Sequence, residues 1–278
     1  MKINKLFLFL AGAGLLFTSC QKEELGTPDQ EEALNIDSEV PESILQKIAS
    51  LHFNPEGATI GKIELPGGGV EKTYIVEGDI VLSANQLNNM SSSNIQDKQY
   101  RTNNLVNNNR TIRVMGYTGG SQALTTKQRT ALQYAIANYN ALNIGLSFTL
   151  TFGTSYSSYD IVVYQTSNGQ AGGVAGFPSN GNPYKFVQIY NGMEQYSVDT
   201  NEHVMTHEIG HTLGMRHTDW FSRQSCGQSG EAAGSDGAVH IPGTPTGYDS
   251  SSIMLACFGA NEDGEFGTYD RVAFEYLY

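Results

Sequence analysis

The sequence has 278 residues, enough for one or two domains with a sizeable core. Acidic residues outnumber basic ones 28 to 16, and because the net charge of −12 repels polyanions, we expect no nucleic-acid partner. No apolar run reaches the ~20 residues that span a bilayer, which argues against a transmembrane helix. The 3 cysteines are too few for a disulfide scaffold.

The N-terminus has the pattern of an export signal. Lys2 and Lys5 precede an apolar segment, Leu6 to Phe17, that is too short to cross a membrane. The following residues, Phe17-Thr18-Ser19-Cys20, resemble the lipobox of bacterial lipoproteins. This resemblance implies a signal peptide over 1–19, acylation of Cys20 and a lipid anchor in the membrane. The expected location is the bacterial outer membrane or cell surface, or the medium after processing. An ordinary signal peptide cut nearby is the alternative.

The next part of the chain changes character twice. Residues 20–37 are acidic and poor in apolar side chains, and they predict a flexible tether. Beyond them the expected elements are a helix at 41–51 and strands at 60–65 and 72–82 around a hairpin turn at 66–69. The stretch from Asn85 to Asn109 is crowded with polar residues and predicts a linker. We therefore expect a small β-rich region with its linker over residues 38–104.

From residue 105 onward, strands and helices are expected in a different order. The pattern predicts strands at 111–117, 146–152, 161–164 and 185–190, and helices at 125–142, 199–213 and 268–277. Asp199 is the expected N-cap of the second helix, because Glu202 stands three residues on in capping-box spacing. This order predicts an α+β or α/β sheet backed by two long helices, followed by a loop-rich second half.

One stretch, HEIGHTLGMRH at residues 207–217, carries the chemistry. His207 and His211 are four residues apart, so a helix places both imidazoles on one face, where they can bind one metal ion. Gly214 can adopt a left-handed conformation that ends the helix and returns His217 as a third ligand. Three histidines leave one open position, as in a catalytic zinc site. A core helix with coincidental histidines is the alternative, and a chance match is on the order of one in 10⁵ such chains.

The pattern HExxHxxGxxH is that of the metzincin zinc peptidases, and HEIGHTLGMRHTD resembles the dual-action HEIGH metallopeptidase family. The resemblance covers roughly residues 105–278. It implies an α+β, metzincin-like zinc peptidase domain with a twisted mixed sheet, two long helices and a loop-rich C-terminal subdomain. It also implies that Met254 is the methionine of the Met-turn beneath the metal. Several metzincin groups have a tyrosine two residues later, but this sequence has Ala256, so no tyrosine ligand is implied.

The function implied is a zinc-dependent endopeptidase acting on extracellular proteins. Zn²⁺ held by His207, His211 and His217 lowers the pKa of a bound water toward ~7. Glu208 then acts as the general base and passes the proton to the leaving amine. A protein or peptide substrate is expected to lie along an edge strand near Gly172–Phe177, for which a flexible loop is the alternative. We expect a monomer. The rival function is a non-catalytic, zinc-containing surface adhesin or binding protein.

Other polar residues near this motif have less certain roles. His203 lies about 12 Å from His211 along the helix axis, too far to share its ion, so a surface or supporting role is expected. Asp219 is interpreted as a surface turn residue, and a supporting role at the site is the alternative. Cys226 and Cys257 flank the third histidine and Met254, and an oxidising location predicts a disulfide between them. Two separate buried thiols are the alternative.

The segment Val76-Glu77-Gly78-Asp79-Ile80 resembles the FxGD motif of astacin propeptides, with Val76 in place of the phenylalanine. The resemblance implies a zymogen in which Asp79 binds the zinc and displaces the catalytic water. Activation then needs cleavage in the polar linker that follows. An ordinary aspartate at the end of a strand is the alternative.

Overall fold

The computed structural model describes residues 39–51, 53–90, 101–220, 222–228 and 240–278, all within one compact unit. The expected signal peptide, Cys20 and the tether lie outside these residues. No helix in the described part of the chain is long and apolar enough to cross a membrane.

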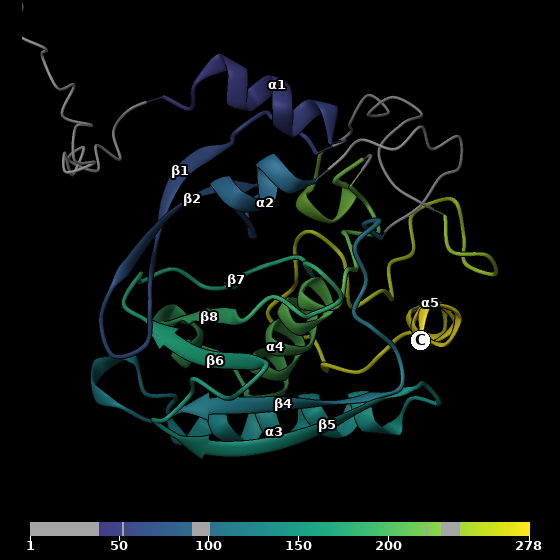
Figure 1. The fold of residues 1–278 in the computed structure, drawn as a ribbon. Helices are drawn as coiled ribbons and strands as arrows, with labels where there is room; N and C mark the ends of the chain where they lie inside the picture. The colour runs from purple at the N-terminus through teal and green to yellow at the C-terminus, as the bar shows by residue number, and fades with distance from the viewer. Residues whose placement is uncertain (1–38, 52, 91–100, 221, 229–239) are drawn as a thin grey trace, which may run out of the picture. The chain divides into compact units, whose positions relative to one another are not determined.

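An 8-stranded mixed sheet organises the unit, with the order β1-β2-β3-β7-β8-β6-β4-β5 (Figure 1). Its strands are β1 Thr59–Glu64, β2 Val70–Val76, β3 Ile80–Ser83, β4 Arg110–Tyr117, β5 Leu146–Gly153, β6 Ile161–Thr166, β7 Gly173–Gly176 and β8 Phe186–Tyr190. Neighbouring strands from β8 through β6 and β4 to β5 are parallel. Strand β7 is antiparallel to β8 and parallel to β3, and β1, β2 and β3 are antiparallel in turn.

Two long helices pack beside this sheet and beside each other. The helices are α1 Glu42–Ser50, α2 Ala84–Asn89, α3 Thr126–Ala141, α4 Val198–Thr212 and α5 Thr268–Leu277, with 3-10 turns at Gly120–Gln122, Asn191–Gln195 and Gln224–Cys226. Helix α3 packs against β5 and α4, and α4 also packs against β7 and β8. The expected α+β class with a mixed sheet is therefore confirmed.

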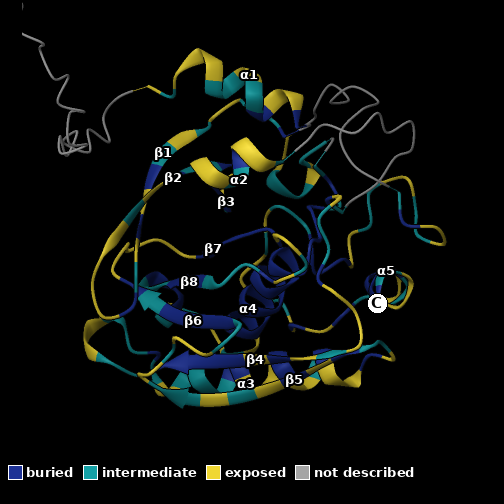
Figure 2. Cartoon of the chain, viewed as in Figure 1, coloured by how far each residue is buried: buried dark blue, intermediate teal, exposed yellow. Residues whose placement is uncertain are grey.

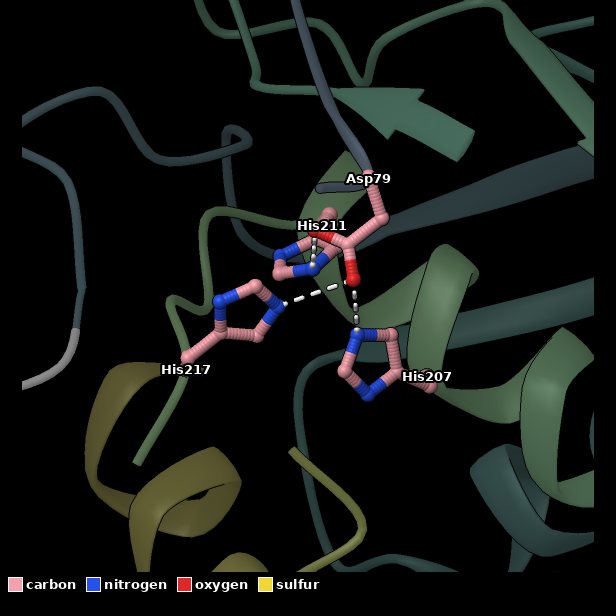
Figure 3. A group of neighbouring side chains, drawn as sticks. All are labelled: Asp79, His207, His211 and His217. Atoms are coloured by element: carbon pink, nitrogen blue, oxygen red, sulfur yellow. Dashed lines mark hydrogen bonds and ion pairs between the residues drawn. The ribbon is translucent and has the colours of Figure 1, made fainter. Parts of the chain in front are cut away.

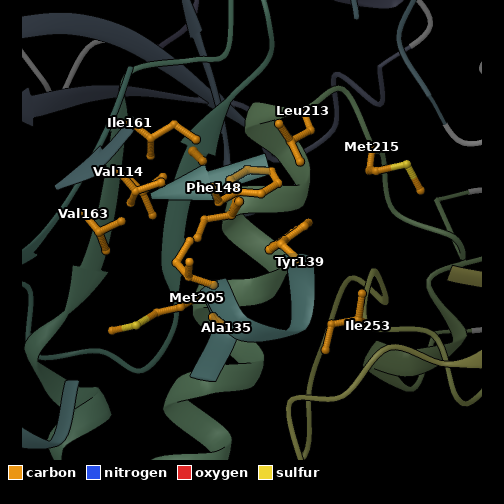
Figure 4. Packing of buried hydrophobic residues seen from close by; sticks show 14 of the residues in the cluster. Val114, Ala135, Tyr139, Phe148, Ile161, Val163, Met205, Leu213, Met215 and Ile253 are labelled. Carbon is orange, nitrogen blue, oxygen red and sulfur yellow. The ribbon is translucent and has the colours of Figure 1, made fainter. Parts of the chain in front are cut away.

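The main hydrophobic core joins the sheet to α3 and α4 (Figure 4). Val114 of β4, Tyr139 of α3 and Met205 of α4 are all buried in it. Helix α4 is buried along almost its whole length, and every residue from Thr200 to Thr212 is buried (Figure 2). Burying a polar side chain costs free energy unless the side chain is paired. The buried histidines and Glu208 on this helix therefore indicate a functional site.

A second hydrophobic cluster joins the region before the linker to the rest of the chain. Its buried members are Ile48, Leu51, Phe53, Val76, Ile80, Leu82, Leu87 and Phe177. Phe177 is the one buried member of this cluster that follows the linker in sequence. Strand β3 makes a further connection, since Ile80 lies opposite Ala175 of β7. The β-rich region thus continues the sheet of the second part.

Two expectations about this region are wrong. The strand expected at 72–82 is interrupted, because Glu77 and Gly78 adopt φ angles of 54° and 99° that turn the chain between β2 and β3. Apolar residues continue on both sides of the turn and hide it in the sequence. The polar stretch after Asn85 also begins inside a helix, α2, which Ser83 caps by accepting a hydrogen bond from the Gln86 backbone amide.

Candidate active site

Helix α4 positions the first two histidines. Its N-cap is Ser197, whose hydroxyl accepts a hydrogen bond from the Thr200 amide over 3.0 Å, so the expected cap at Asp199 is wrong. Both residues are good cap formers, and Asp199 lies instead in the first turn, where its charge suits the helix dipole. His207 and His211 then fall on one face, with ring centroids 4.6 Å apart.

Backbone carbonyls orient these two rings. The Nδ1 atom of His207 lies 2.8 Å from the Ile253 oxygen, and that of His211 lies 2.7 Å from the Met215 oxygen. A carbonyl can only accept, so each Nδ1 carries the proton and each Nε2 keeps a lone pair. Both Nε2 atoms are buried and have no hydrogen-bond partner within the described residues. This is the arrangement that a metal ion requires of two histidine ligands.

The chain turns sharply after α4 and returns His217 to the same point. Gly214 has a φ of 106°, as expected, and a Cβ there would lie 2.9 Å from the Asn104 carbonyl oxygen. The His217 ring centroid is 4.9 Å from that of His211 and 5.3 Å from that of His207. The three imidazoles therefore surround one position.

Asp79 reaches that position from the turn before β3 (Figure 3). One carboxylate oxygen, Oδ2, lies 3.0 Å from Nε2 of His217 and 3.4 Å from Nε2 of His207. The other, Oδ1, lies 3.9 Å from Nε2 of His211. The four potential ligand atoms all lie within 4.8 Å of one another, and three nitrogens with one oxygen fit a four-coordinate zinc ion.

Glu208 lies beside this group. Its side chain is 2% exposed, and its Oε2 has no hydrogen-bond partner among the described residues. Burial first, and then the charge of Asp79, raise the pKa of Glu208 well above its usual range. Gly173 leaves it room, because a Cβ there would lie 2.9 Å from the Glu208 Cγ.

A cavity of about 280 Å³ opens beside Asp79, His207 and Glu208, along Gly172 and Gly173. The segment expected to form an edge strand is β7, and β3 covers its outer side in this structure. His203 also lines the cavity and is 6% exposed, so the expected surface role is wrong. Burial and the neighbouring His207 lower the pKa of His203 to about 3, so it is neutral at physiological pH.

Met254 packs against α4 next to the histidines. It is fully buried, and its sulfur lies 2.6 Å from where a Cβ on Gly210 would be, so the glycine of the motif makes room for it. Asp270 of α5 supports the loop before Met254 by accepting hydrogen bonds from the Ser252 hydroxyl over 2.7 Å and the Ile253 amide over 2.8 Å. The sequence analysis did not single out Asp270, although an acid in the first turn of a helix often caps it.

Asp219 supports the same loop from the other side. It is 0% exposed and accepts hydrogen bonds over 2.9 Å from the amides of Ser225 and Ala256. The interpretation as a surface residue is therefore wrong. The two partners follow Asp219 by 6 and 37 residues, so the longer contact has no local signal in the sequence.

A disulfide joins Cys226 to Cys257, with their Cα atoms 5.1 Å apart and a separation of 31 positions in sequence. Closing a loop of this size restricts the unfolded chain, so replacing both cysteines with serine is expected to lower the free energy of unfolding by about 3 kcal/mol. Urea unfolding of the variant and of the wild type measures the difference. Wild type treated with a reductant is the matched control and should show the same loss. Equal midpoints for all three samples would mean that the bridge does not stabilise the fold.

Two further residues at the site were not singled out from the sequence. The Glu77 carboxylate accepts a hydrogen bond from the buried guanidinium of Arg216 over 2.7 Å, and its other oxygen lies 3.4 Å from Nδ1 of His217. Burial alone would raise the pKa of Glu77, but the charge of Arg216 and the proximity of His217 lower it to about 2. Arg216 stands inside the motif, yet nothing local in the sequence indicates a partner 139 residues away.

Comparison with known families agrees with this geometry. Residues 74–278 match the model of the dual-action HEIGH metallo-peptidase family. The chain belongs to this family. It is accordingly a zinc metallopeptidase, which acts on protein or peptide substrates, and its three histidines with Asp79 form a group that can hold the zinc.

The matched region begins within β2 and therefore includes Glu77 and Asp79. No curated protein matches the chain. Two solved structures of myroilysin are similar at 17% identity, each with a TM-score of 0.37. The match to the first structure covers 61% of this chain and 83% of the myroilysin chain. The match to the second covers 59% of this chain and 78% of the myroilysin chain. A likeness this distant assigns no function.

Proposed function

We propose that this zinc metallopeptidase is an endopeptidase of extracellular proteins, made as a latent precursor. The observation that carries the proposal is the convergence of three buried histidines on Asp79, with Glu208 beside them. His207, His211 and His217 would hold the zinc, which supplies an activated water and polarises the scissile carbonyl. An adhesin has no need of a buried glutamate whose carboxylate lacks a hydrogen-bond partner within the described residues.

Residues of the chain itself transfer the proton, orient the histidine rings and support the site from below. Glu208 takes the proton of the attacking water and delivers it to the leaving amine, and departure of Asp79 would remove one of the two causes that raise its pKa. The carbonyls of Ile253 and Met215 keep two of the rings in the tautomer that a metal needs. Met254, packed against Gly210, would serve as the Met-turn under the site.

Latency has two supports in the region before the linker. Asp79 fills the position between the histidines, and its charge adds to the burial that raises the pKa of Glu208. Strand β3 covers β7, along which an extended substrate would otherwise add a strand. Cleavage in the linker would let this region leave. We further propose that export follows the N-terminal signal, with a lipid on Cys20 holding the enzyme at the cell surface until it is processed.

Removing the metal tests the proposed chemistry. Dialysis against 1,10-phenanthroline is expected to abolish cleavage of casein by the activated enzyme, and one equivalent of Zn²⁺ should restore it. The metal-free protein should also melt several degrees lower, because an ion bound only to the folded state stabilises it. Measurements of zinc content, melting temperature and activity check this together, with added Mg²⁺ as the control that should not restore activity. Full activity without bound metal would refute the proposal.

A further inference from the structure

Arg216 is a buried cation held by the region that the proposed activation removes. Its guanidinium donates to Glu77 over 2.7 Å and lies 4.4 Å from the Phe53 ring centroid. The side chain is 2% exposed, although an unpaired buried charge is costly. Both partners named here precede the linker, so release of that region takes an acidic group and an aromatic ring away from Arg216.

Arg223 holds the backbone of the same residue. Its Nη1 donates to the Glu77 carbonyl oxygen over 3.0 Å, and its side chain lines the cavity beside Glu208. Both arginines thus bind Glu77. Arg216 binds the Glu77 carboxylate, and Arg223 binds the Glu77 main-chain oxygen. We call Arg216 and Arg223 the arginine clamp.

The clamped residue lies close to the reaction centre. Glu77 is two residues before Asp79, whose oxygens lie between the three histidines, and its Oε2 is 3.4 Å from Nδ1 of His217. A peptide bound across the site would present one of its side chains to the clamp at a comparable separation from the scissile bond. The carboxylate of Glu77 shows what chemistry the clamp accepts.

We propose that the arginine clamp is a specificity site of the activated enzyme, which selects substrates with an acidic side chain within two residues of the scissile bond. Glu77 stands in for that side chain in the precursor. The inference rests on the proposed function, since it concerns the substrate of the same site. A guanidinium in a desolvated pocket favours a carboxylate over an amide of the same shape, because the charge-assisted hydrogen bond to a carboxylate is stronger.

Matched peptides test the proposal. Two peptides with amidated C-termini differ only in glutamate or glutamine beside the scissile bond, and each flanking position is tried in turn. The activated wild type is expected to favour glutamate at one position by about tenfold or more in kcat/KM. In Arg216→Gln that ratio should fall toward one, whereas Arg223→Gln should slow both peptides alike, because Arg223 binds a main-chain oxygen that both peptides carry. Arg271→Gln, at an exposed ion pair on α5, is the control that should keep the ratio.

Several outcomes would overturn the proposal. Equal cleavage of both peptides at every position does so, as does a preference that survives in Arg216→Gln. A further pair of peptides carries its only carboxylate at a free C-terminus in the same position. A preference confined to that pair would mean that the clamp recognises chain ends and not acidic side chains. Failure to cleave any peptide would instead count against the proposed peptidase function.

A binding measurement tests the proposed specificity independently of the proposed peptidase activity, and it needs no variant of the protein. The chain has 1 tryptophan, Trp220, whose ring centroid is 5.4 Å from the Arg216 guanidinium, so its fluorescence reports on the clamp. A peptide of residues 74–82 is titrated into the activated protein, alongside its Glu77→Gln and Asp79→Asn versions. Glu77→Gln should weaken binding by about tenfold. Equal affinity of the first two peptides would overturn the proposal even in an inactive protein.

Discussion

Replacing Glu208 with glutamine is expected to lower kcat/KM of the activated enzyme by about 10²- to 10⁴-fold, the usual contribution of a positioned general base. Glutamine keeps the shape of the side chain beside Gly173 but cannot accept a proton. Zinc content should stay at the wild-type value, because the histidines that would hold the ion are unchanged. Cleavage of a fluorogenic peptide and metal analysis of the same samples measure both.

A second glutamate on the same helix provides the matched control. Glu202 is also buried, but it accepts a hydrogen bond from Asn138 of α3 over 2.7 Å. Burial first, and then Glu265, raise its pKa to about 7, so glutamine resembles the protonated form that is already present near neutral pH. Glu202→Gln should retain activity. Equal activity of Glu208→Gln and wild type would remove Glu208 from the mechanism.

The second large effect is expected at Asp79. Changing it to alanine in the uncleaved precursor should give hydrolysis of a small peptide that the wild-type precursor does not cleave. The variant frees the position between the histidines and removes a charge that raises the pKa of Glu208. The gain should be smaller for a protein substrate, since β3 still lies along β7. Initial rates on both substrates, with gel analysis to confirm that the chain is intact, check this.

Asp79→Asn is the natural companion variant. It keeps the size of the side chain and removes its charge, so it separates blocking of the position from the effect on Glu208. We expect intermediate activity. If Asp79→Ala binds zinc, folds normally and stays latent, Asp79 is not the switch, and the coverage of β7 by β3 becomes the main cause of latency.

The sequence predicted the parts of the site that depend on local geometry. Helical periodicity brings His207 and His211 together, and the left-handed Gly214 returns His217. Partners distant in sequence were beyond such reasoning. Asp219 looked like a turn residue because its contact with Ala256 forms only in the folded chain.

Fold predictions failed where two local signals compete. Ser197 and Asp199 are both good caps, and the choice depends on where the preceding 3-10 turn ends. The two apolar runs within 72–82 were interpreted as one strand, and only the backbone conformation at Glu77 and Gly78 divides it. That division mattered, because it places Glu77 and Asp79 at the tip of a turn where both can reach the histidines.

The pairing of β3 with β7 has a consequence for the activated enzyme. If cleavage in the linker removes the leading region, as proposed, β7 becomes an edge strand of the sheet, and its backbone amides and carbonyls can pair with another chain. An exposed edge strand normally promotes aggregation with other chains. Strand β7 is short, from Gly173 to Gly176. Phe177, which follows β7, would lose its contacts with the apolar side chains of the leading region. In a peptidase, an exposed edge strand can bind substrate, because the extended chains that pair with it are the chains to be cleaved.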